Sequence, residues 1–192
     1  MRSTNPYDAF NSFFSEANLY KSRFSLSLIM AKEDYIVIDE DNFEKVRKQI
    51  DKAHSSGKKT AVIAKADEFN RKIIEKTKAD IIFGFESENK NKKDRLKQRE
   101  SGVNQVLCKL MKENDKTAGI NFNEIAKLKE KQLSSYIGKL KQNIFLFSKY
   151  KTKVILLNTN KKNKHDLMAF LLSLGMPAYM VKFAIDNRIN LE

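Results

Sequence analysis

The sequence predicts an α/β fold built around a buried parallel sheet, and two observations support this prediction. Short apolar runs rich in β-branched residues recur along the chain, and amphipathic helical patterns lie between them. The runs are too short for helices and too continuously apolar for strands that face water, which is typical of a buried parallel sheet. A chain in which strands and helices alternate forms βαβ units with right-handed crossovers.

Five runs carry the strand pattern, and a sixth is a candidate. The five are Tyr35–Ile38, Thr60–Ala64, Asp80–Gly84, Thr117–Phe122 and Val154–Asn158. The candidate, Phe24–Met30, alternates apolar residues with serines before it ends in an apolar stretch. No G-x-G-x-x-G follows the first strands, which argues against a dinucleotide-binding fold. The pattern alone leaves an open doubly wound sheet and a closed barrel as alternatives.

Helical patterns fill the intervals between the strands. The predicted helices span residues 43–53, 68–78, 103–113, 123–149, 167–174 and 177–189. Asp67 and Asn123 are the predicted N-caps of the second and fourth helices. Gly175 ends the fifth helix and Pro177 begins the last.

The chain is expected to form one domain. Its 192 residues suit a single core, and it has only two prolines, six glycines and no low-complexity linker. We therefore predict one α/β domain over residues 1–192, with residues 1–22 as an irregular N-terminal extension.

The charge of the chain indicates a polyanionic partner. Lysine and arginine number 37 against 24 acidic residues, a formal net charge of +13, while 41% hydrophobic residues argue against disorder. Such an excess favours phosphate backbones first and anionic membrane surfaces second, and a lysine-rich solvated surface is the alternative. The N-terminus lacks the apolar run of a secretory signal and no window could span a membrane, so we expect a cytoplasmic protein.

Basic residues gather in two runs that follow predicted strands. They are Lys90, Lys92, Lys93, Arg95, Lys97 and Arg99 in the first, and Lys161, Lys162, Lys164 and His165 in the second. Loops that follow parallel strands open on the carboxyl edge of a sheet, so both runs, joined by Lys65, are predicted to form one positive rim. No aromatic residues interleave with them, which favours contact with a nucleic-acid backbone over base stacking. Two solvated loops without a ligand are the alternative.

Residues suited to catalysis are scarce. His54 and His165 are the two histidines, far apart in sequence and without a metal-binding spacing. We interpret His54 as a helix-end residue and His165 as a phosphate-contacting or capping residue. Cys108 is interpreted as a small core residue. No catalytic triad or phosphate-binding loop is present, so we expect no catalytic residue, metal or cofactor on the chain itself.

Three segments carry a resemblance to a known family. The first begins at Thr60–Ala64, which is followed by an N-R pair, Asn70 and Arg71, and then by A-D-I-I-F at 79–83. The second is S-G-V-N-Q-V-L-C-K-L at 101–110. The third is D-L-M-A-F-L-L-S-L-G-M at 166–176. Over residues 58–191 the chain resembles the RNase P protein component 3 family, the thirty-kilodalton-type subunit of archaeal and eukaryotic ribonuclease P. Arg71, Ser101, Gly102 and Asn104 match its motif positions, although Ser101 and Gly102 could equally be the cap and turn that start a helix.

The resemblance implies a fold, partners and an activity. The fold would be a TIM-barrel-like domain related to metal-dependent phosphoesterases, and the short chain suggests a reduced or irregular barrel. The partners would be RNase P RNA, a small partner subunit and other RNase P proteins, with precursor tRNA contacted indirectly and no membrane. The holoenzyme removes the 5′ leader of precursor tRNA, and its Mg²⁺ and catalysis belong to the RNA.

The sequence also departs from the family pattern. After residues 154–158 the family usually has a turn of small residues, whereas this chain has Asn158, Thr159 and Asn160 followed by lysines. Residues 1–57 match poorly. The alternative function is a free-standing metal-dependent phosphoesterase of the same barrel type, with a metal site made of carboxylates.

Overall fold

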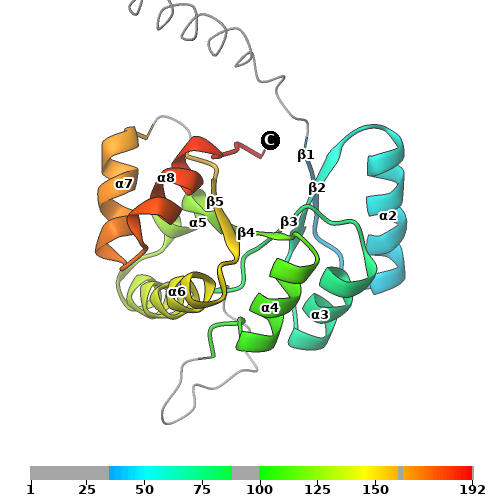
Figure 1. Cartoon of the computed structure of the whole chain (residues 1–192), viewed down its shortest axis with the longest axis horizontal. Coiled ribbons are helices and arrows are strands. Elements are labelled where there is room, and N and C mark those ends of the chain that lie inside the picture. The colour runs from blue at the N-terminus through cyan, green and yellow to red at the C-terminus, as the bar shows by residue number, and fades with distance from the viewer. Residues whose placement is uncertain (1–34, 88–99, 160–161, 192) are drawn as a thin grey trace, which may run out of the picture. The chain divides into compact units, whose positions relative to one another are not determined.

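A parallel sheet of five strands runs through the chain in sequence order (Figure 1). The computed structural model describes residues 35–87, 100–159 and 162–191. The strands are β1 (Tyr35–Ile38), β2 (Lys59–Ile63), β3 (Ile81–Phe83), β4 (Thr117–Asn121) and β5 (Lys153–Leu157). The predicted parallel α/β fold is therefore confirmed. The candidate strand Phe24–Met30 and the extension 1–22 lie outside the described residues.

Helices connect each strand to the next, and two more follow β5. They are α2 (Phe43–Ser55), α3 (Asp67–Lys76), α4 (Gln105–Glu113), α5 (Phe122–Lys127), α6 (Glu130–Tyr150), α7 (Lys164–Ser173) and α8 (Ala178–Asp186). In Figure 1, α2, α3, α4, α6, α7 and α8 follow one another in an arc around the sheet. None of the helices in the described ranges is long and apolar enough to cross a membrane.

The order of the strands excludes the doubly wound alternative. Every crossover moves to the next strand in the same direction, so right-handed connections place the helices on one face of the sheet. The large core lies between the helices and that face, and a smaller cluster of Ala61, Ile81, Phe83, Ile155 and Leu157 lies on the other. The strands of a closed barrel follow one another in the same order and direction. In this structure β5 and β1 are not paired within the described residues, so closure of the sheet into a barrel stays a prediction.

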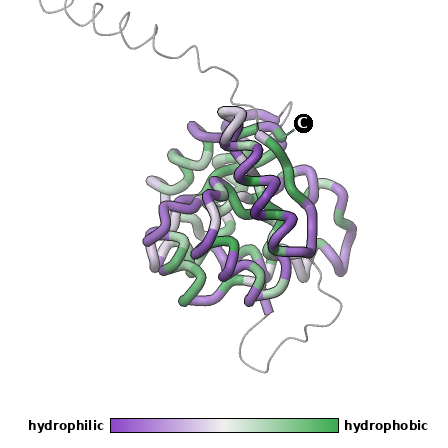
Figure 2. Tube along the Cα trace, turned by 90° about the vertical axis from the view of Figure 1, so that its right-hand side faces the viewer, coloured by the Kyte–Doolittle hydropathy of each residue, from purple (hydrophilic) through white to green (hydrophobic). Residues whose placement is uncertain are grey.

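The hydropathy of the chain follows this layering. Figure 2 shows hydrophobic tube in the interior and hydrophilic tube on the outer turns of the helices that face the viewer. In α2, for example, Val46, Ile50 and Ala53 are buried at helical spacing while the intervening residues are exposed. Burial of one stripe of each helix against the sheet is the main favourable contribution to the fold.

Two predicted helices differ from those observed. Residues 123–149 form two helices, because Leu128 and Lys129 have extended backbone angles that interrupt the hydrogen-bond ladder. Asn123 accordingly lies inside α5 and does not cap a helix. The last helix ends at Asp186 rather than near Ile189, which instead forms a parallel bridge to Leu157 of β5.

The start of α3 also differs from the prediction. Asp67, the predicted N-cap, is the first helical residue, and Ala66 precedes it without a side-chain cap. The carboxylate still lies in the first turn, where it interacts favourably with the helix dipole. The predicted end of the fifth helix at Gly175 is confirmed, since this glycine has a left-handed φ of 86°.

Candidate functional site

Polar side chains gather where the strands end, at the carboxyl edge of the sheet. Lys65 follows β2 at this edge, as predicted, but its ammonium lies 2.6 Å from Asp39 Oδ1 and 3.1 Å from Asp41 Oδ1. The hydrogen bond to Asp39 is the main cause that raises the pKa of Lys65 above its ordinary value. A phosphate at Lys65 would have to compete with two carboxylates, so contact between this lysine and RNA stays a prediction.

Most of the predicted basic rim lies outside the described residues. This applies to Lys90, Lys92, Lys93, Arg95, Lys97, Arg99 and Lys161. Of the rest, the Lys162 ammonium lies 5.9 Å from the centroid of the Phe122 ring, and the Lys164 ammonium lies 3.1 Å from Asp186 Oδ1. The convergence of the two basic runs on one rim therefore stays a prediction.

His165 does not cap α7. The residue before the helix, Asn163, is the cap, and its side-chain oxygen accepts a hydrogen bond of 2.9 Å from the His165 N–H. The capping alternative for His165 is therefore wrong. The His165 side chain is exposed beside Lys164, where a phosphate contact remains a prediction.

The N-R pair of α3 divides into a buried and an exposed residue. Asn70 is 1% exposed; its Oδ1 accepts from the Lys65 N–H at 2.8 Å, and its Nδ2 donates to the Lys65 carbonyl at 3.0 Å. Arg71 is exposed and pairs with Glu75 at 3.0 Å one turn along the helix. Asn70 thus holds the backbone of the turn after β2, whereas Arg71 remains the residue open to a ligand.

Ser101 and Gly102 form a buried turn, and Asn104 is the cap that starts α4. The Asn104 Oδ1 accepts from the Leu107 N–H at 2.9 Å. Gly102 has a φ of 75°, and a Cβ at this position would lie 2.3 Å from the Phe85 carbonyl oxygen. Only glycine fits this close approach. The structural interpretation of the pair as the cap and turn that start a helix is therefore correct for the turn at Gly102 and wrong for the cap, which is Asn104.

A buried asparagine joins the two segments that flank the first basic run. Asn143 of α6 donates through Nδ2 to Glu86 Oε1 at 2.7 Å and to the Ser101 carbonyl at 3.0 Å. Gln142 donates to Ser101 Oγ at 3.0 Å. We call Glu86, Ser101 and Asn143 the Asn143 clamp. It connects Glu86 and Ser101, which lie in the described segments before and after residues 88–99.

Glu86 is a buried titratable residue that was not predicted from the sequence. It is 2% exposed, and its Oε2 has no hydrogen-bond partner among the described residues. Burial is the main cause that raises the pKa of Glu86 from 4.5 to about 7. A glutamate inside the apolar stretch 81–86 was the available signal. Its burial, however, depends on α6.

Glu86 lines a polar cavity of about 100 Å³ together with Tyr136. Ser87, Glu124 and Lys139 also contribute to its walls. The Tyr136 hydroxyl is buried without a partner in the described part of the chain, and burial, followed by the Glu86 charge, raises the pKa of Tyr136. The cavity thus gathers unpaired oxygen atoms near the carboxyl edge of the sheet, where α/β proteins commonly bind ligands.

Replacing Glu86 with glutamine is expected to change how stability depends on pH. Between pH 4.5 and about 7 the folded chain holds a proton that the unfolded chain releases, so the free energy of unfolding contributed by Glu86 falls as the pH rises. Glu86→Gln stays neutral, and it should exceed the wild type by on the order of 3 kcal/mol at pH 8, with little difference at pH 4. Denaturant unfolding at several pH values, with exposed Glu113→Gln as control, measures this difference. A difference that is constant with pH would contradict it.

Cys108 and His54, the other side chains considered for catalysis, make contacts typical of structural residues. Cys108 lies in the core with 0% exposure, as predicted, and burial raises the pKa of its thiol to about 11. His54 Nε2 lies 3.2 Å from Asp80 Oδ2 at the amino edge of the sheet. Within residues 35–87, 100–159 and 162–191, no three histidine, cysteine or acidic side chains are placed to hold one metal ion.

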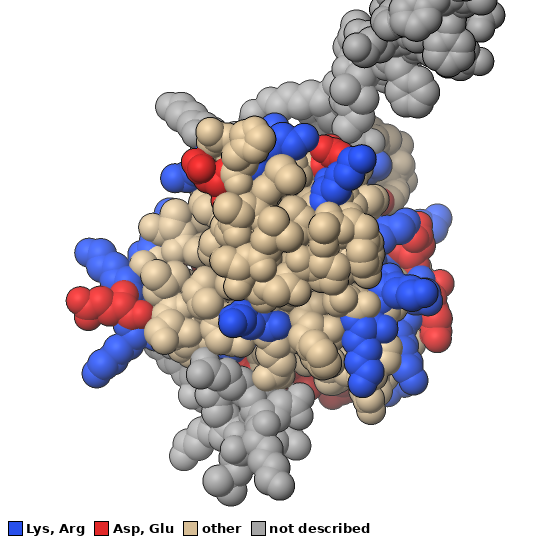
Figure 3. Space-filling view, turned by 60° about the vertical axis from the view of Figure 1, so that its left-hand side comes forward, with Lys and Arg blue, Asp and Glu red and all other residues tan. Residues whose placement is uncertain are grey.

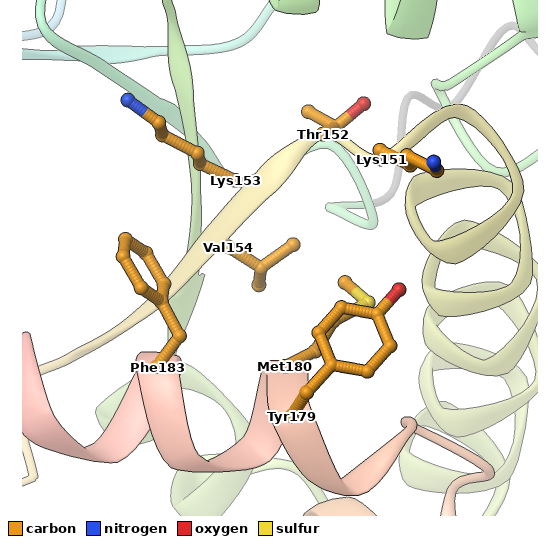
Figure 4. A pocket seen from close by; sticks show the side chains of 7 residues that line it. All are labelled: Lys151, Thr152, Lys153, Val154, Tyr179, Met180 and Phe183. Carbon is orange, nitrogen blue, oxygen red and sulfur yellow. The ribbon is translucent and has the colours of Figure 1, made fainter.

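An apolar groove lies at the opposite end of β5 from the carboxyl edge (Figure 4). Its volume is about 600 Å³, and it is lined by residues 151–154 and by Tyr179, Met180 and Phe183 of α8. Tyr179 is 64% exposed and Phe183 is 40% exposed. Figure 3, which brings the side of α7 and α8 forward, shows a face of mostly uncharged residues, with one basic group near its centre and most of the other charged residues toward its edges. Exposed apolar surface of this kind is typical of contact sites.

The fold is similar to that of a chain in a cryo-EM structure of archaeal ribonuclease P with mature tRNA. The TM-score is 0.67 at 19% sequence identity, and the match covers 95% of this chain and 74% of that chain. An amidohydrolase matches with a TM-score of 0.42 at 9% identity, covering 60% of this chain and 27% of that one. A xylose isomerase domain protein from Planctomyces limnophilus matches with a TM-score of 0.39 at 15% identity, covering 75% and 59%. No protein-family model and no curated protein sequence matches the chain. At these identities the similarities concern the fold alone.

Proposed function

We propose that this protein is a subunit of ribonuclease P that binds and supports the catalytic RNA. The observation that carries the proposal is the fold similarity over 95% of the chain to a component of an archaeal ribonuclease P structure. The family resemblance at 101–110 and the net charge of +13 support it independently. The chain would supply no catalytic group, and the Mg²⁺ and the hydrolysis of the precursor-tRNA phosphodiester would belong to the RNA. A cytoplasmic location follows from that role.

Reconstitution tests this function directly. Precursor-tRNA cleavage by the cognate RNase P RNA is measured at low Mg²⁺, with this chain and the small partner subunit present or withheld. Stimulation that requires this chain supports the proposal, and no stimulation under any condition overturns it. Hydrolysis of a generic phosphodiester by the purified chain alone, abolished by a chelator, would instead favour the free-standing phosphoesterase.

RNA binding is expected to depend steeply on salt and on the first basic run. Glutamine at Lys90, Lys92, Lys93, Arg95, Lys97 and Arg99 removes six cations that would displace counterions from RNA. Each phosphate contact contributes about 0.7 to the slope of log K against log salt, so the six substitutions should make this slope less steep by about 4. Filter binding of RNase P RNA over a salt series measures the slope.

A control removes the same charge from another surface. The matched substitutions to glutamine are at Arg47, Lys48, Lys52, Lys58, Lys76 and Lys78, which are exposed on or beside α2 and α3. Their slope should remain close to that of the wild type. Equal losses in both variants would show a general charge effect and contradict a specific role of residues 90–99.

We assign protein partners to the apolar groove rather than to the carboxyl edge. Of the two lysines that line it, Lys153 is already paired with Asp115 at 2.7 Å, which leaves Lys151 as the lining lysine that forms no ion pair within the described residues. Apolar walls with so little available positive charge suit apolar side chains of a protein, flanked by a carboxylate, better than a phosphate backbone.

Phe183→Asp is expected to weaken binding of the small RNase P subunit at least tenfold, because it places a charge in an apolar contact. The control is Phe145→Asp, since Phe145 is 64% exposed on α6, outside the groove. Isothermal titration with the purified subunit measures both. Wild-type affinity in Phe183→Asp would contradict this assignment.

A further inference from the structure

Three buried oxygen atoms at or next to the cavity beside Glu86 have no hydrogen-bond partner in the described residues, and two of them belong to side chains that line it. They are Glu86 Oε2, the Tyr136 hydroxyl and, from the adjoining clamp, Asn143 Oδ1. Their residues are 2%, 5% and 0% exposed, so bulk water does not satisfy these atoms. Leaving such a group buried and unpaired is unfavourable, which indicates that this place is built to receive a partner.

The chemistry of the three atoms indicates a hydrogen-bond donor. A carboxylate oxygen and an amide oxygen only accept hydrogen bonds, and a tyrosine hydroxyl can accept as well as donate. Glu124 adds a second carboxylate to the cavity wall and Lys139 adds one ammonium. With both carboxylates ionised, these three side chains carry a net charge of −1, which one monovalent cation neutralises.

The size of the cavity and its environment narrow the class of cation. A volume of about 100 Å³ has room for several water-sized groups, and therefore for an ammonium with its first methylenes. Leu128 provides an apolar wall for those methylenes. A phosphate would meet two carboxylates, and the described residues offer no set of three metal-ligating side chains at this place.

We propose that the cavity formed by Glu86, Glu124 and Tyr136 binds a primary alkylammonium group. The group is either the end of a free polyamine or the side chain of a lysine on a bound protein. The three N–H donors of an ammonium match the unpaired oxygens of Glu86 and Tyr136 and leave one donor for the cavity mouth. This site is separate from the apolar groove and does not depend on a role in ribonuclease P.

The binding of the ammonium is coupled to the ionisation of Glu86. The groups that face Glu86 are Ser87 from its own segment, Glu124 from α5, and Tyr136, Lys139 and Asn143 from α6. Because burial holds the pKa of Glu86 at about 7, the Glu86 carboxyl of the empty cavity is mostly protonated, and therefore neutral, in mildly acidic solution. Affinity for the ammonium should therefore fall about tenfold between pH 8 and pH 6.

Calorimetric titration of the full chain tests the proposal with named probes. They are 1,4-diaminobutane and spermidine for the polyamine source, Nα-acetyl-lysine methylamide and a lysine-containing peptide for the protein source, and Mg²⁺ alone. We expect saturable binding of an amine at pH 8. Stronger binding of the diamine or spermidine identifies a free polyamine, and stronger binding of the lysine probes identifies a protein partner.

Two near-isosteric variants and one control make the result specific. Glu86→Gln and Tyr136→Phe should each weaken amine binding at least tenfold, whereas exposed Glu113→Gln should not. Tyr136→Phe should also raise the thermal stability of the free protein, because it removes a buried unpaired hydroxyl. This gain shows that the variant folds, so its loss of binding is interpretable.

Three results would overturn the proposal. The first is no amine binding up to about 10 mM at pH 8, which would mean that ordered water alone occupies the cavity. The second is binding that both variants leave unchanged, which would show that the amines bind at another place on the protein. The third is competition in which Mg²⁺ displaces the amine and binds more tightly, which would make the cavity a metal site.

Discussion

Replacing Gly102 with alanine is expected to lower the free energy of unfolding by about 3 kcal/mol or more. Two costs add. The φ of 75° is strained for any residue with a Cβ, and that Cβ would lie 2.3 Å from the Phe85 carbonyl oxygen. A backbone oxygen cannot rotate away as the end of a side chain can. The turn before α4 and the segment after β3 would have to separate, and the Asn143 clamp with them.

Gly57→Ala is a matched control for this prediction. Gly57 has a similar φ of 70°, but nothing lies within 4 Å of its added Cβ. Gly57→Ala should therefore lower the free energy of unfolding only through the strained backbone conformation, by about 1 kcal/mol. Urea unfolding of both variants measures the difference. Equal losses would show that the close approach to Phe85 contributes nothing and that Gly102 is required only for its backbone conformation.

Replacing Asn143 with alanine is expected to lower the free energy of unfolding by about 3 kcal/mol. The change leaves Glu86 Oε1 and the Ser101 carbonyl buried without their donor. The Asn143 hydrogen bond also lowers the pKa of Glu86, so its removal should raise that pKa further above about 7. The loss of stability should for that reason be larger at pH 8 than at pH 5.

The control for Asn143→Ala is Asn114→Ala. The Asn114 amide also donates to a carbonyl, that of Leu110 at 2.9 Å, but the residue is exposed and water can replace the bond. Its loss should stay within about 0.5 kcal/mol. Unfolding at both pH values, combined with RNA binding at one salt concentration, shows whether the clamp also positions the basic run. A loss for Asn143→Ala that is small and independent of pH would contradict the clamp.

The elements of the fold were predictable because their signals are local. Tyr35–Ile38 was predicted to the residue, and the other four strands to within one residue at each end. An apolar run of this length has few options besides a buried strand, since it must leave water and is too short for a helix. The single helix expected over 123–149 failed because the apolar spacing continues across the break at Leu128 and Lys129.

The candidate site was predictable only in outline. Lys65 was expected at the carboxyl edge and lies there, because the end of a parallel strand determines that position. Its pairing with Asp39 was not predicted, since the two residues are brought together by the register of β1 and β2. The roles of Asn70 and Asn163 were missed for a different reason: each satisfies backbone groups, and a polar side chain gives no sign in sequence of which groups it will meet.

The sequence by itself determined the alternation of strands and helices, the buried parallel sheet and the excess of positive charge. These properties depend on spacing and composition along the chain, which act over a few residues. Only the tertiary structure decided that Asn143 reaches Glu86 and Ser101, which are 57 and 42 residues away. It also decided that Glu86 is buried beside Tyr136. The reason is physical: burial and hydrogen-bond partners are set by packing between elements, and packing joins residues that the sequence keeps apart.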